Sequence, residues 1–222
     1  MFNLFVNAEG GLTTAGYAVT IILAVLALIL ALVLAGKSTE KRKLSTKQLV
    51  FCAMALALGF ATSYIKLFPL PFGGSVTAFS MLFIVLIGYW YGPKTGILVG
   101  FAYGIMQFLQ EPYVLSFFQV CCDYLLAFAA LGLGGFFRNS KHGLIKGYLA
   151  AIITRGAFHT LGGYLYWMDY MPEEFPQALS FLYPVIYNYS YILAEAALTL
   201  ILLSIPAVKK AMEQVRRNAL SC

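Results

Sequence analysis

Three ionisable side chains lie inside long apolar segments of this sequence: Asp123, Arg155 and Glu195. A charged group at the centre of a membrane helix costs about 2.5 to 3.5 kcal/mol on insertion scales, so such residues mark either a functional site or a buried ion pair. Arg155 and Glu195 could pair with each other. We favour a structural ion pair between these two residues over a proton relay.

The depth of each polar residue below the outer membrane surface follows from its position along its helix. With about 1.5 Å of rise per residue, Asp123 lies roughly 12 Å, His159 roughly 15 Å and Asn188 roughly 10 Å below that surface. Arg155 and Glu195 both lie roughly 21 Å deep by the same arithmetic. The sequence therefore predicts an outer layer with one carboxylate, one imidazole and one amide, above a deeper layer of opposite charges.

Aromatic residues are dense around the outer layer, and they include Tyr124, Tyr164, Tyr166, Trp167, Tyr183, Tyr187, Tyr189 and Tyr191. Trp167 follows His159 by eight residues, which places both on roughly one face of a helix. Tyr183 and Asn188 are roughly 140° apart on a straight helix, so they share a site only from its rim or across a bend near Pro184.

A carboxylate, an imidazole, an amide and several aromatic faces together suit a flat, nitrogen-rich, cationic ligand. Rings over a cation contribute about 0.5 to 2 kcal/mol each, and the amide can bind the edge of a heterocycle. Simpler interpretations remain open at this point. Tyrosines and tryptophans also form interfacial belts, and a lone histidine such as His159 is more often a packing residue.

The composition indicates the solvent in which these side chains must be positioned. Of the 222 residues, 61% are hydrophobic and only 11% are charged, and the mean hydropathy is +0.81. Soluble domains are about half apolar and about a quarter charged. We therefore expect a polytopic membrane protein in a lipid bilayer and exclude disorder and nucleic-acid binding. The four cysteines have no metal-ligand spacing, so we expect no metal site and no disulfide framework.

About 20 apolar residues are needed to cross the hydrocarbon, and the sequence predicts seven such spans: 14–35, 48–68, 77–91, 95–109, 114–137, 145–168 and 182–208. All should be helical, because a lipid-facing strand would leave backbone groups unpaired. The third and fourth spans are separated by Gly92, Pro93 and Lys94, which is typical of a tight helical hairpin. The predicted fold class is an all-α membrane bundle with six core helices and one extra N-terminal transmembrane helix.

The basic residues sort to one side of these spans, and 13 of the 15 lie there: Lys37, Lys41, Arg42, Lys43, Lys47, Lys94, Arg138, Lys141, Lys146, Lys209, Lys210, Arg216 and Arg217. By the positive-inside rule this side is cytoplasmic, so the N-terminus is outside and the C-terminus inside. The polar stretch 36–48 divides the chain. Residues 1–47 form a transmembrane helix with a basic cytoplasmic linker, and 48–222 form a six-helix substrate-binding domain with a short cytoplasmic tail.

Two stripes of small residues recur at every fourth position: Gly96, Gly100 and Gly104, and Ala53, Ala57 and Ala61. The glycine ridge indicates internal helix packing. Internal packing is also the simplest interpretation of the alanine stripe. The chain has no G-x-x-x-x-G-K-[ST] loop, so transport driven by ATP would require an ATPase in another chain.

Four segments carry a resemblance to a known family: PFGGSVTAFSMLF, EPYVLSFFQVCCDYLLAFAALGLGG, RGAFHTLGGYLYW and LYPVIYNYSY. Over about residues 48–208 the chain resembles the thiamine-specific substrate-binding (S) component of energy-coupling factor (ECF) transporters. The resemblance implies a non-enzymatic six-helix bundle without a cofactor, which captures thiamine outside the bacterial plasma membrane. It further implies two kinds of partner, a transmembrane coupling subunit and a pair of ABC-type ATPases.

The resemblance also implies roles for individual residues. The family contacts its ligand through an acidic–Tyr pair, a pocket histidine, a stacking tryptophan and a Tyr–Asn pair, which match Asp123, Tyr124, His159, Trp167, Tyr183 and Asn188. The S component docks on its coupling subunit through a small-residue stripe on the first core helix, which matches Ala53, Ala57 and Ala61.

Two positions depart from some members of the family. A tryptophan of the first outer loop is replaced by Gly74, so we expect the lid to close through the backbone and Phe72. Asp123 replaces a glutamate, which should change affinity but not ligand class. Three alternatives stay open: an S component for another vitamin or a thiamine precursor, a membrane-embedded enzyme using His159 and Asp123, and a secondary transporter. The last is disfavoured because no internal symmetry is visible.

Overall fold

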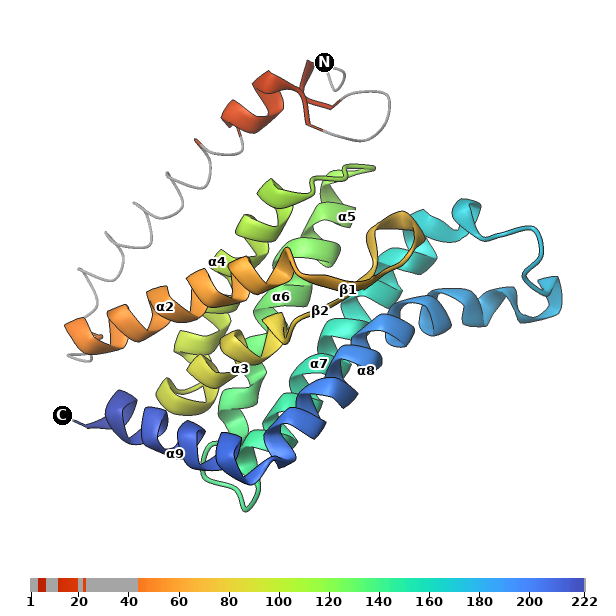
Figure 1. Cartoon of the computed structure of the whole chain (residues 1–222). Helices are drawn as coiled ribbons and strands as arrows, with labels where there is room; N and C mark the ends of the chain where they lie inside the picture. The colour runs from red at the N-terminus through yellow and green to blue at the C-terminus, as the bar shows by residue number, and fades with distance from the viewer. Residues whose placement is uncertain (1–3, 7–11, 20–21, 23–43, 222) are drawn as a thin grey trace.

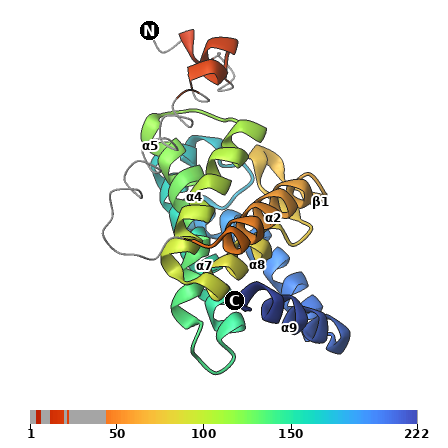
Figure 2. The ribbon, with the colours of Figure 1, turned by 90° about the vertical axis from the view of Figure 1, so that its left-hand side faces the viewer.

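The computed structural model describes residues 4–6, 12–19, 22 and 44–221 as a bundle of helices (Figure 1). Of the predicted first span, 14–35, only residues 14–19 and 22 are described; the rest of it and residues 36–43 of the linker lie outside the described residues. The helices that run along the bundle are α2 (Thr46–Ser63), α3 (Ser80–Tyr91), α4 (Pro93–Gln110), a composite helix over residues 117–137, α7 (Gly143–Gly162) and α8 (Tyr183–Ser204). Figure 2 shows them side by side when the bundle is turned.

The helix α2 begins at a capping box and ends earlier than the sequence predicts. The Ser45 side chain accepts from the Gln48 backbone N–H, and the Gln48 side chain accepts from the Ser45 N–H. The chain then leaves the helix after Ser63. The strand β1 (Lys66–Pro69) pairs antiparallel with β2 (Ser75–Thr77), across the short helix η2 (Pro71–Gly73).

The expectation that every predicted span is helical throughout is therefore wrong at the end of the second span and the start of the third. Pro69 and Pro71 cannot extend a helix, because proline has no backbone N–H and crowds the preceding turn. The two short strands satisfy each other's backbone groups as a hairpin. Helix α3 begins only at Ser80, after Phe79 in the left-handed conformation at φ +63°.

The predicted hairpin between the third and fourth spans and the glycine ridge are both confirmed. Gly92 joins α3 to α4 at φ +97°, a conformation that glycine adopts without strain. A Cβ on Gly100 would lie 2.4 Å from the carbonyl oxygen of Phe128, and one on Gly104 would lie 2.3 Å from that of Tyr124. The ridge lets α4 approach the backbone of the composite helix closely, as small-residue stripes do in membrane bundles.

The fifth and sixth predicted spans both contain π-helical turns. The composite helix consists of α5 (Phe117–Val120), the π-helical η3 (Cys121–Leu126), α6 (Ala127–Ala129) and η4 (Ala130–Phe137). Helix α7 continues into the π-helical η5 (Gly163–Trp167) and then the 3₁₀ turn η6 (Met168–Tyr170). A further turn, η7 (Gln177–Leu182), precedes α8. Such π-turns occur frequently at functional sites.

The last predicted span is wrong at its C-terminal end. Helix α8 stops at Ser204, and a separate helix, α9 (Pro206–Leu220), follows the extended residue Ile205. Proline at the first position favours a new helix over continuation of the old one. The predicted short tail is thus helical, and it returns to the bundle, where Tyr91 donates to the Ala219 carbonyl at 3.1 Å.

The alanine stripe on α2 does not pack internally. Ala53, Ala57 and Ala61 are all exposed, while the opposite face of α2 buries Cys52, Ala55 and Gly59 in the core. The internal-packing interpretation of this stripe is therefore wrong.

By length and hydropathy, three helical stretches of the described chain are able to cross a membrane: Thr46–Ser63, Phe117–Phe137 and Gln177–Ser204. Helix α3 is apolar but shorter.

Candidate ligand-binding site

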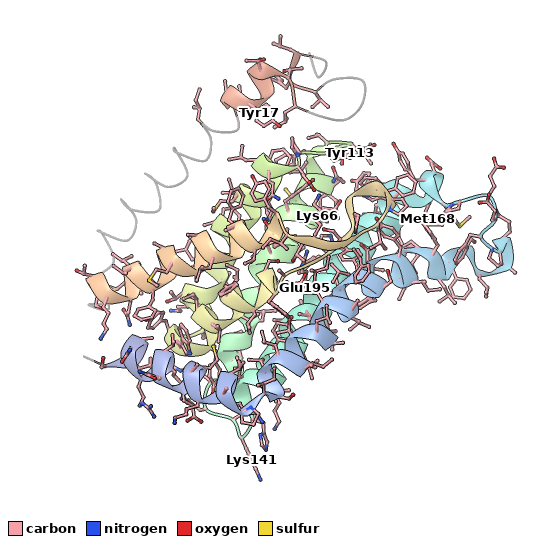
Figure 3. All side chains as sticks on the ribbon, viewed as in Figure 1. Tyr17, Lys66, Tyr113, Lys141, Met168 and Glu195 are labelled. Carbon is pink, nitrogen blue, oxygen red and sulfur yellow. The ribbon has the colours of Figure 1, made fainter. Side chains whose placement is uncertain are left out.

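A cavity of about 550 Å³ is lined in part by the β1–β2 hairpin and the turn between its strands. Figure 3 shows Lys66, at the start of this hairpin, far along the bundle from Lys141. All eight residues predicted for a ligand site or its lid line this one cavity: Phe72, Gly74, Asp123, Tyr124, His159, Trp167, Tyr183 and Asn188. They come from η2, the loop after it, the π-turns η3 and η5, and helices α7 and α8. The structure thus brings together side chains that are far apart in the sequence.

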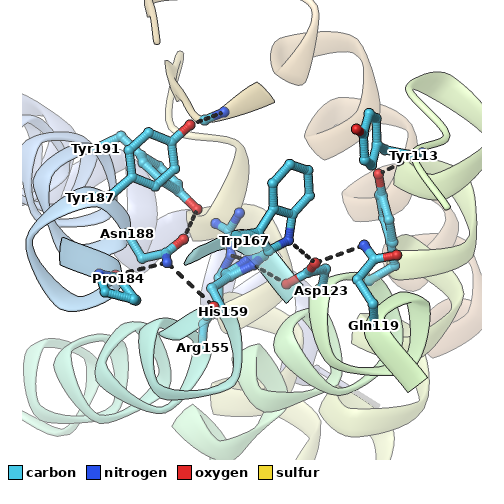
Figure 4. Close-up of polar contacts among 12 residues, drawn as sticks. Tyr113, Gln119, Asp123, Arg155, His159, Trp167, Pro184, Tyr187, Asn188 and Tyr191 are labelled. Carbon is cyan, nitrogen blue, oxygen red and sulfur yellow. Dashed lines mark hydrogen bonds and ion pairs between the residues drawn. The ribbon is translucent and has the colours of Figure 1, made fainter. Parts of the chain in front are cut away.

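Asp123 is the centre of a polar network in the cavity wall (Figure 4). Its Oδ2 accepts from Gln119 Nε2 at 2.8 Å and from Trp167 Nε1 at 3.3 Å, and its Oδ1 lies 3.3 Å from His159 Nδ1. The Asp123 side chain is only 13% exposed, and that of His159 only 12%. Three donors from three helical segments therefore fix the carboxylate in a largely dehydrated position.

His159 connects Asp123 to the deeper layer. Arg155 Nε donates to His159 Nε2 at 3.3 Å, so Nε2 is an acceptor and the proton lies on Nδ1, which faces Asp123. The guanidinium carbon of Arg155 also lies 4.5 Å from the centre of the Phe128 ring. With these contacts the imidazole is held as a neutral ring in one orientation.

The predicted ion pair between Arg155 and Glu195 is wrong. Among the described residues, the Lys or Arg side chain that lies within 4.0 Å of a carboxylate is Lys66, which pairs with Glu111, whereas the neutral His159 ring hydrogen-bonds to Asp123. Arg155 faces His159 and Phe128, whereas the Glu195 carboxylate accepts from Thr77 and Met81 at the start of α3. The two side chains therefore contact different neighbours.

Asn188 is held in place by its own helix and by α7. Its Nδ2 donates to the carbonyls of Pro184 at 2.9 Å and His159 at 3.3 Å, and its Oδ1 accepts from the Tyr191 hydroxyl at 3.0 Å. Both amide protons are therefore used. A carbonyl oxygen has two lone pairs, so Oδ1 retains one acceptor position for a donor on a ligand. Tyr183 lies at the partly exposed rim, one helical turn before Tyr187, with the ring centres 6.0 Å apart.

A group of aromatic rings surrounds Trp167. Tyr113 lies 4.8 Å from it between ring centres, tilted by 33°, and Tyr170 lies 5.2 Å away. The hydroxyls of Tyr113 and Tyr170 are 3.0 Å apart. This hydrogen bond, together with burial, raises the pKa of the Tyr113 phenol to about 12, so the phenol stays neutral at physiological pH. The rings offer π faces next to the Asp123 carboxylate, an arrangement suited to an organic cation.

Tyr124 contributes its ring to the cavity and uses its hydroxyl to hold the loop above. The hydroxyl donates to the Glu111 carbonyl at 2.7 Å and accepts from the Tyr113 N–H at 3.2 Å. Its ring meets that of Phe108 at 5.0 Å.

The hairpin β1–β2, with the turn between its strands, forms a lid along one side of the cavity, and its tip is attached to α8. The Gly74 N–H donates to the Tyr187 hydroxyl at 3.1 Å, and that hydroxyl donates to the Pro71 carbonyl. A Cβ on Gly74 would lie 2.8 Å from the same hydroxyl and 2.9 Å from the Tyr191 ring, so a larger residue would force either the lid or these two tyrosine side chains to shift. Phe72 adopts φ +63°, and its ring contacts Tyr170 at 5.6 Å.

Comparison with known proteins assigns the chain to a protein family. Residues 49–214 match the model of a family described as thiamine transporter protein (Thia_YuaJ). The chain belongs to this family. It is 29% identical to the thiamine transporter ThiT of Bacillus subtilis (strain 168) over 165 residues, which cover 64% of this chain and 81% of that protein.

The fold is also that of a solved membrane transport protein. ThiT from Listeria monocytogenes matches with a TM-score of 0.60 at 23% identity, over 75% of this chain and 95% of that one. A structure described as the S component of a bacterial ECF transporter matches at 21% identity with a TM-score of 0.44, over 71% of this chain and 96% of that one. The predicted helical membrane bundle is confirmed, and the enzyme alternative is set aside because the family is one of transporters.

Sequence reasoning missed several residues that surround the site in this member of the thiamine transporter family. Gln119 could have been found, because it lies four residues before Asp123 and four-residue spacing brings side chains to one helix face. Tyr113 lies in a loop and Tyr170 ends the short 3₁₀ turn η6, and neither segment has a periodic pattern. Lys66 and Glu111 form an ion pair at the partly exposed edge of the cavity, and neither was considered as part of it.

Proposed function

We propose that this protein is the thiamine-binding S component of an ATP-driven ECF-type importer and captures thiamine on the extracellular side. Membership of the thiamine transporter family supports this proposal. The observation that carries it is the position of the dehydrated Asp123 carboxylate between Trp167 and His159 in a cavity walled by aromatic rings.

The chemistry of the cavity corresponds to that of thiamine. Thiamine joins a permanently cationic thiazolium ring to an aminopyrimidine. In the proposed mode the thiazolium lies near Asp123 and against the rings of Trp167 and Tyr113, where the carboxylate supplies the counter-charge. The aminopyrimidine lies toward α8, with its amino group near the remaining acceptor position of Asn188 and with Tyr183 at the rim.

The same network explains why an anion would be a poor substrate. Arg155 is the one arginine among the lining residues, and its guanidinium is already engaged by His159 and Phe128. Lys66 is paired with Glu111. The Asp123 carboxylate, which has no Lys or Arg nitrogen within 4.0 Å, is therefore the charge beside the aromatic cluster that a cation can neutralise, and burial strengthens this attraction.

The proposed orientation follows the distribution of basic residues. In this orientation the cavity faces the outside, with the C-terminus in the cytoplasm and the N-terminus outside, and residues 48–222 act as the substrate-binding domain after an N-terminal helix in 1–47. Arg138, Lys141 and Lys146 lie in or just after the turn that connects the composite helix to α7. Figure 3 shows Lys141 at the far end of the bundle from Tyr113 and Met168.

The proposed partners are a transmembrane coupling subunit and two ABC-type ATPases. The docking surface is the alanine stripe of Ala53, Ala57 and Ala61 on α2. Its exposure supports this role, because a row of small side chains allows the backbone of a partner helix to approach closely in a membrane.

Tryptophan fluorescence of the purified protein tests the binding function. The chain has two tryptophans, Trp90 and Trp167. Trp90 is buried against Phe51 in the bundle core, whereas Trp167 lines the cavity. Thiamine should quench the fluorescence saturably, Trp167→Phe should abolish the ligand-dependent change, and Trp90→Phe should retain it. A titration with riboflavin in place of thiamine, corrected for absorption of the emitted light by the flavin, should give no saturable change that depends on Trp167. Absence of quenching by thiamine, or quenching that depends on Trp90, would refute the proposal.

A further inference from the structure

Glu195 is a buried charge that the proposed thiamine contacts do not use. It lies on α8, its relative exposure is 2%, and it reaches the wall of the cavity. Within the described part of the chain, no Lys, Arg or His nitrogen lies within 4.0 Å of its carboxylate. A carboxylate buried in a membrane protein without a basic partner is costly, so its hydrogen-bond donors must stabilise it.

Those donors all come from one short segment of the chain, residues 77–81. Glu195 Oε2 accepts from the Thr77 backbone N–H at 2.9 Å and from Thr77 Oγ1 at 2.6 Å. Its Oε1 accepts from the Met81 N–H at 3.3 Å, and Ser80 Oγ lies 3.5 Å away. Thr77 Oγ1 and Ser80 Oγ are themselves 2.7 Å apart. Both carboxylate oxygens are thus engaged by the same segment.

The segment needs an external acceptor because of its own conformation. Residues 80–91 form α3, whose first N–H groups have no partner within the helix. The preceding residue, Phe79, adopts the left-handed conformation and provides no side-chain cap. The Glu195 carboxylate therefore caps α3 from another helix, and the positive end of the α3 dipole favours its negative charge.

The capped segment is also the base of the lid. Strand β2 ends at Thr77, so the hydrogen bonds from Thr77 hold the point where the β1–β2 hairpin leaves the bundle. The tip of the lid is held separately by Tyr187, eight residues earlier on the same helix. One helix, α8, therefore holds the lid at its tip and its base. Figure 3 shows Glu195 beside the start of α3, below the hairpin.

The two attachments differ in strength. The Glu195 attachment is charge-assisted, buried and made through several donors, whereas the Tyr187 attachment is a pair of neutral hydrogen bonds on a partly exposed side chain. Hydrogen bonds to an ionised group are roughly twice as strong as neutral ones. The tip should therefore detach first, while the base stays fixed.

We propose that Glu195 is the anchor of the lid: its carboxylate fixes the 77–81 segment to α8, so that the hairpin opens at its tip and closes again in register over the cavity. Glu195 is a positioning residue that acts through the lid and does not contact the ligand. The proposal rests on the proposed function in one respect, because it assigns the anchor a part in retaining thiamine.

The variant Glu195→Gln tests the anchor. Its side chain has nearly the same shape, but its amide nitrogen cannot accept from Thr77 or Met81. The rate of thiamine dissociation, measured by displacement in stopped-flow fluorescence, should rise at least tenfold, while the amplitude of the Trp167 quench stays unchanged. Hydrogen exchange of the 77–81 amides, measured without thiamine, should also accelerate at least tenfold. Thr77→Val, which removes one hydroxyl donor and keeps the backbone, should give a smaller change in the same direction.

The matched control is Thr199→Val, one turn further along α8. Thr199 Oγ1 accepts from the Tyr148 hydroxyl and donates to the Glu195 carbonyl, so its loss lowers stability without touching the carboxylate. This variant should melt earlier than wild type but keep the wild-type dissociation rate. Unchanged dissociation and exchange in both Glu195→Gln and Thr77→Val would overturn the proposal, as would an equal acceleration in Thr199→Val. If wild type binds no thiamine, the proposed function fails, whereas the exchange measurement still decides the anchor.

Discussion

Trp167 Nε1 lies 3.3 Å from Asp123 Oδ2, although the two residues belong to different helices, and each lies in a π-helical turn. A π-turn contains one more residue than an α-turn, so it rotates the side chains that follow it around the helix axis. The turn η5 begins at Gly163, where an added Cβ would lie 2.7 Å from Pro184. The two π-turns thus bring a ring N–H to a carboxylate at the site where a cation is proposed to bind.

The first prediction concerns the charge of Asp123. Asp123→Asn should weaken thiamine binding about 100-fold or more, because removing one partner of a buried charge interaction costs about 3 kcal/mol or more. Isothermal titration calorimetry in detergent measures the dissociation constant. The control is Glu111→Gln at the cavity edge, where the side chain is 53% exposed and screened by solvent, and its affinity should change less than threefold. Equal affinities of Asp123→Asn and wild type would show that the carboxylate has no part in binding thiamine.

Arg155 gives a second prediction, because its Nε–H holds His159 in one orientation. Arg155→Lys keeps the positive charge but removes this donor, so affinity for thiamine should fall about tenfold, the value of one hydrogen bond to a charged group. If Arg155 acts through the imidazole, the same substitution should have almost no further effect in a His159→Ala background. Additive losses in this double-mutant cycle would show that Arg155 acts independently of His159.

The outer polar layer could be predicted from the sequence because charge inside an apolar segment is costly and therefore informative. Asp123, His159 and Asn188 were placed at similar depths by the rise of a helix alone, and they line one cavity in the structure. The same arithmetic did not predict the partners of Arg155 and Glu195. Depth fixes a residue's level along the helix axis but not the direction in which its side chain points, and packing rotates these two toward different partners.

Other features had no signal in the sequence that simple periodicity detects. The two π-turns shift the phase of the side chains that follow them, but the segments around them are apolar on most faces, so this shift leaves no visible break in the apolar pattern. The lid hairpin was hidden because the residues around Phe68 and Val76 are as apolar as the helices that flank them. Pro206 marks the place where the last predicted span ends too late, so at this position proline is a better guide than hydropathy.

Gly74 allows a third prediction, about closure of the lid. Gly74→Ala places a methyl group against the Tyr187 hydroxyl and the Tyr191 ring, at 2.8 and 2.9 Å, so the lid tip or these two side chains must shift and the attachment of the tip to α8 should loosen. Thiamine should then dissociate about tenfold faster in a displacement experiment. The neighbouring substitution Ser75→Ala removes a hydroxyl from the same loop without adding atoms, and it should leave the rate within twofold of wild type. A wild-type dissociation rate in Gly74→Ala would contradict the close approach of the lid to α8.

The last prediction separates binding from transport. Ala57 is exposed on α2, away from the cavity, and lies between the two other alanines of the proposed docking stripe. Ala57→Leu should therefore leave the thiamine dissociation constant and the melting temperature of the purified protein unchanged. Uptake of labelled thiamine by cells that express the variant together with its coupling and ATPase subunits should fall to background, because the leucine keeps the partner helix from approaching. The control is Leu58→Ala at the adjacent exposed position, which adds no bulk and should transport normally. Normal uptake by Ala57→Leu would show that the coupling subunit docks on another surface of the bundle.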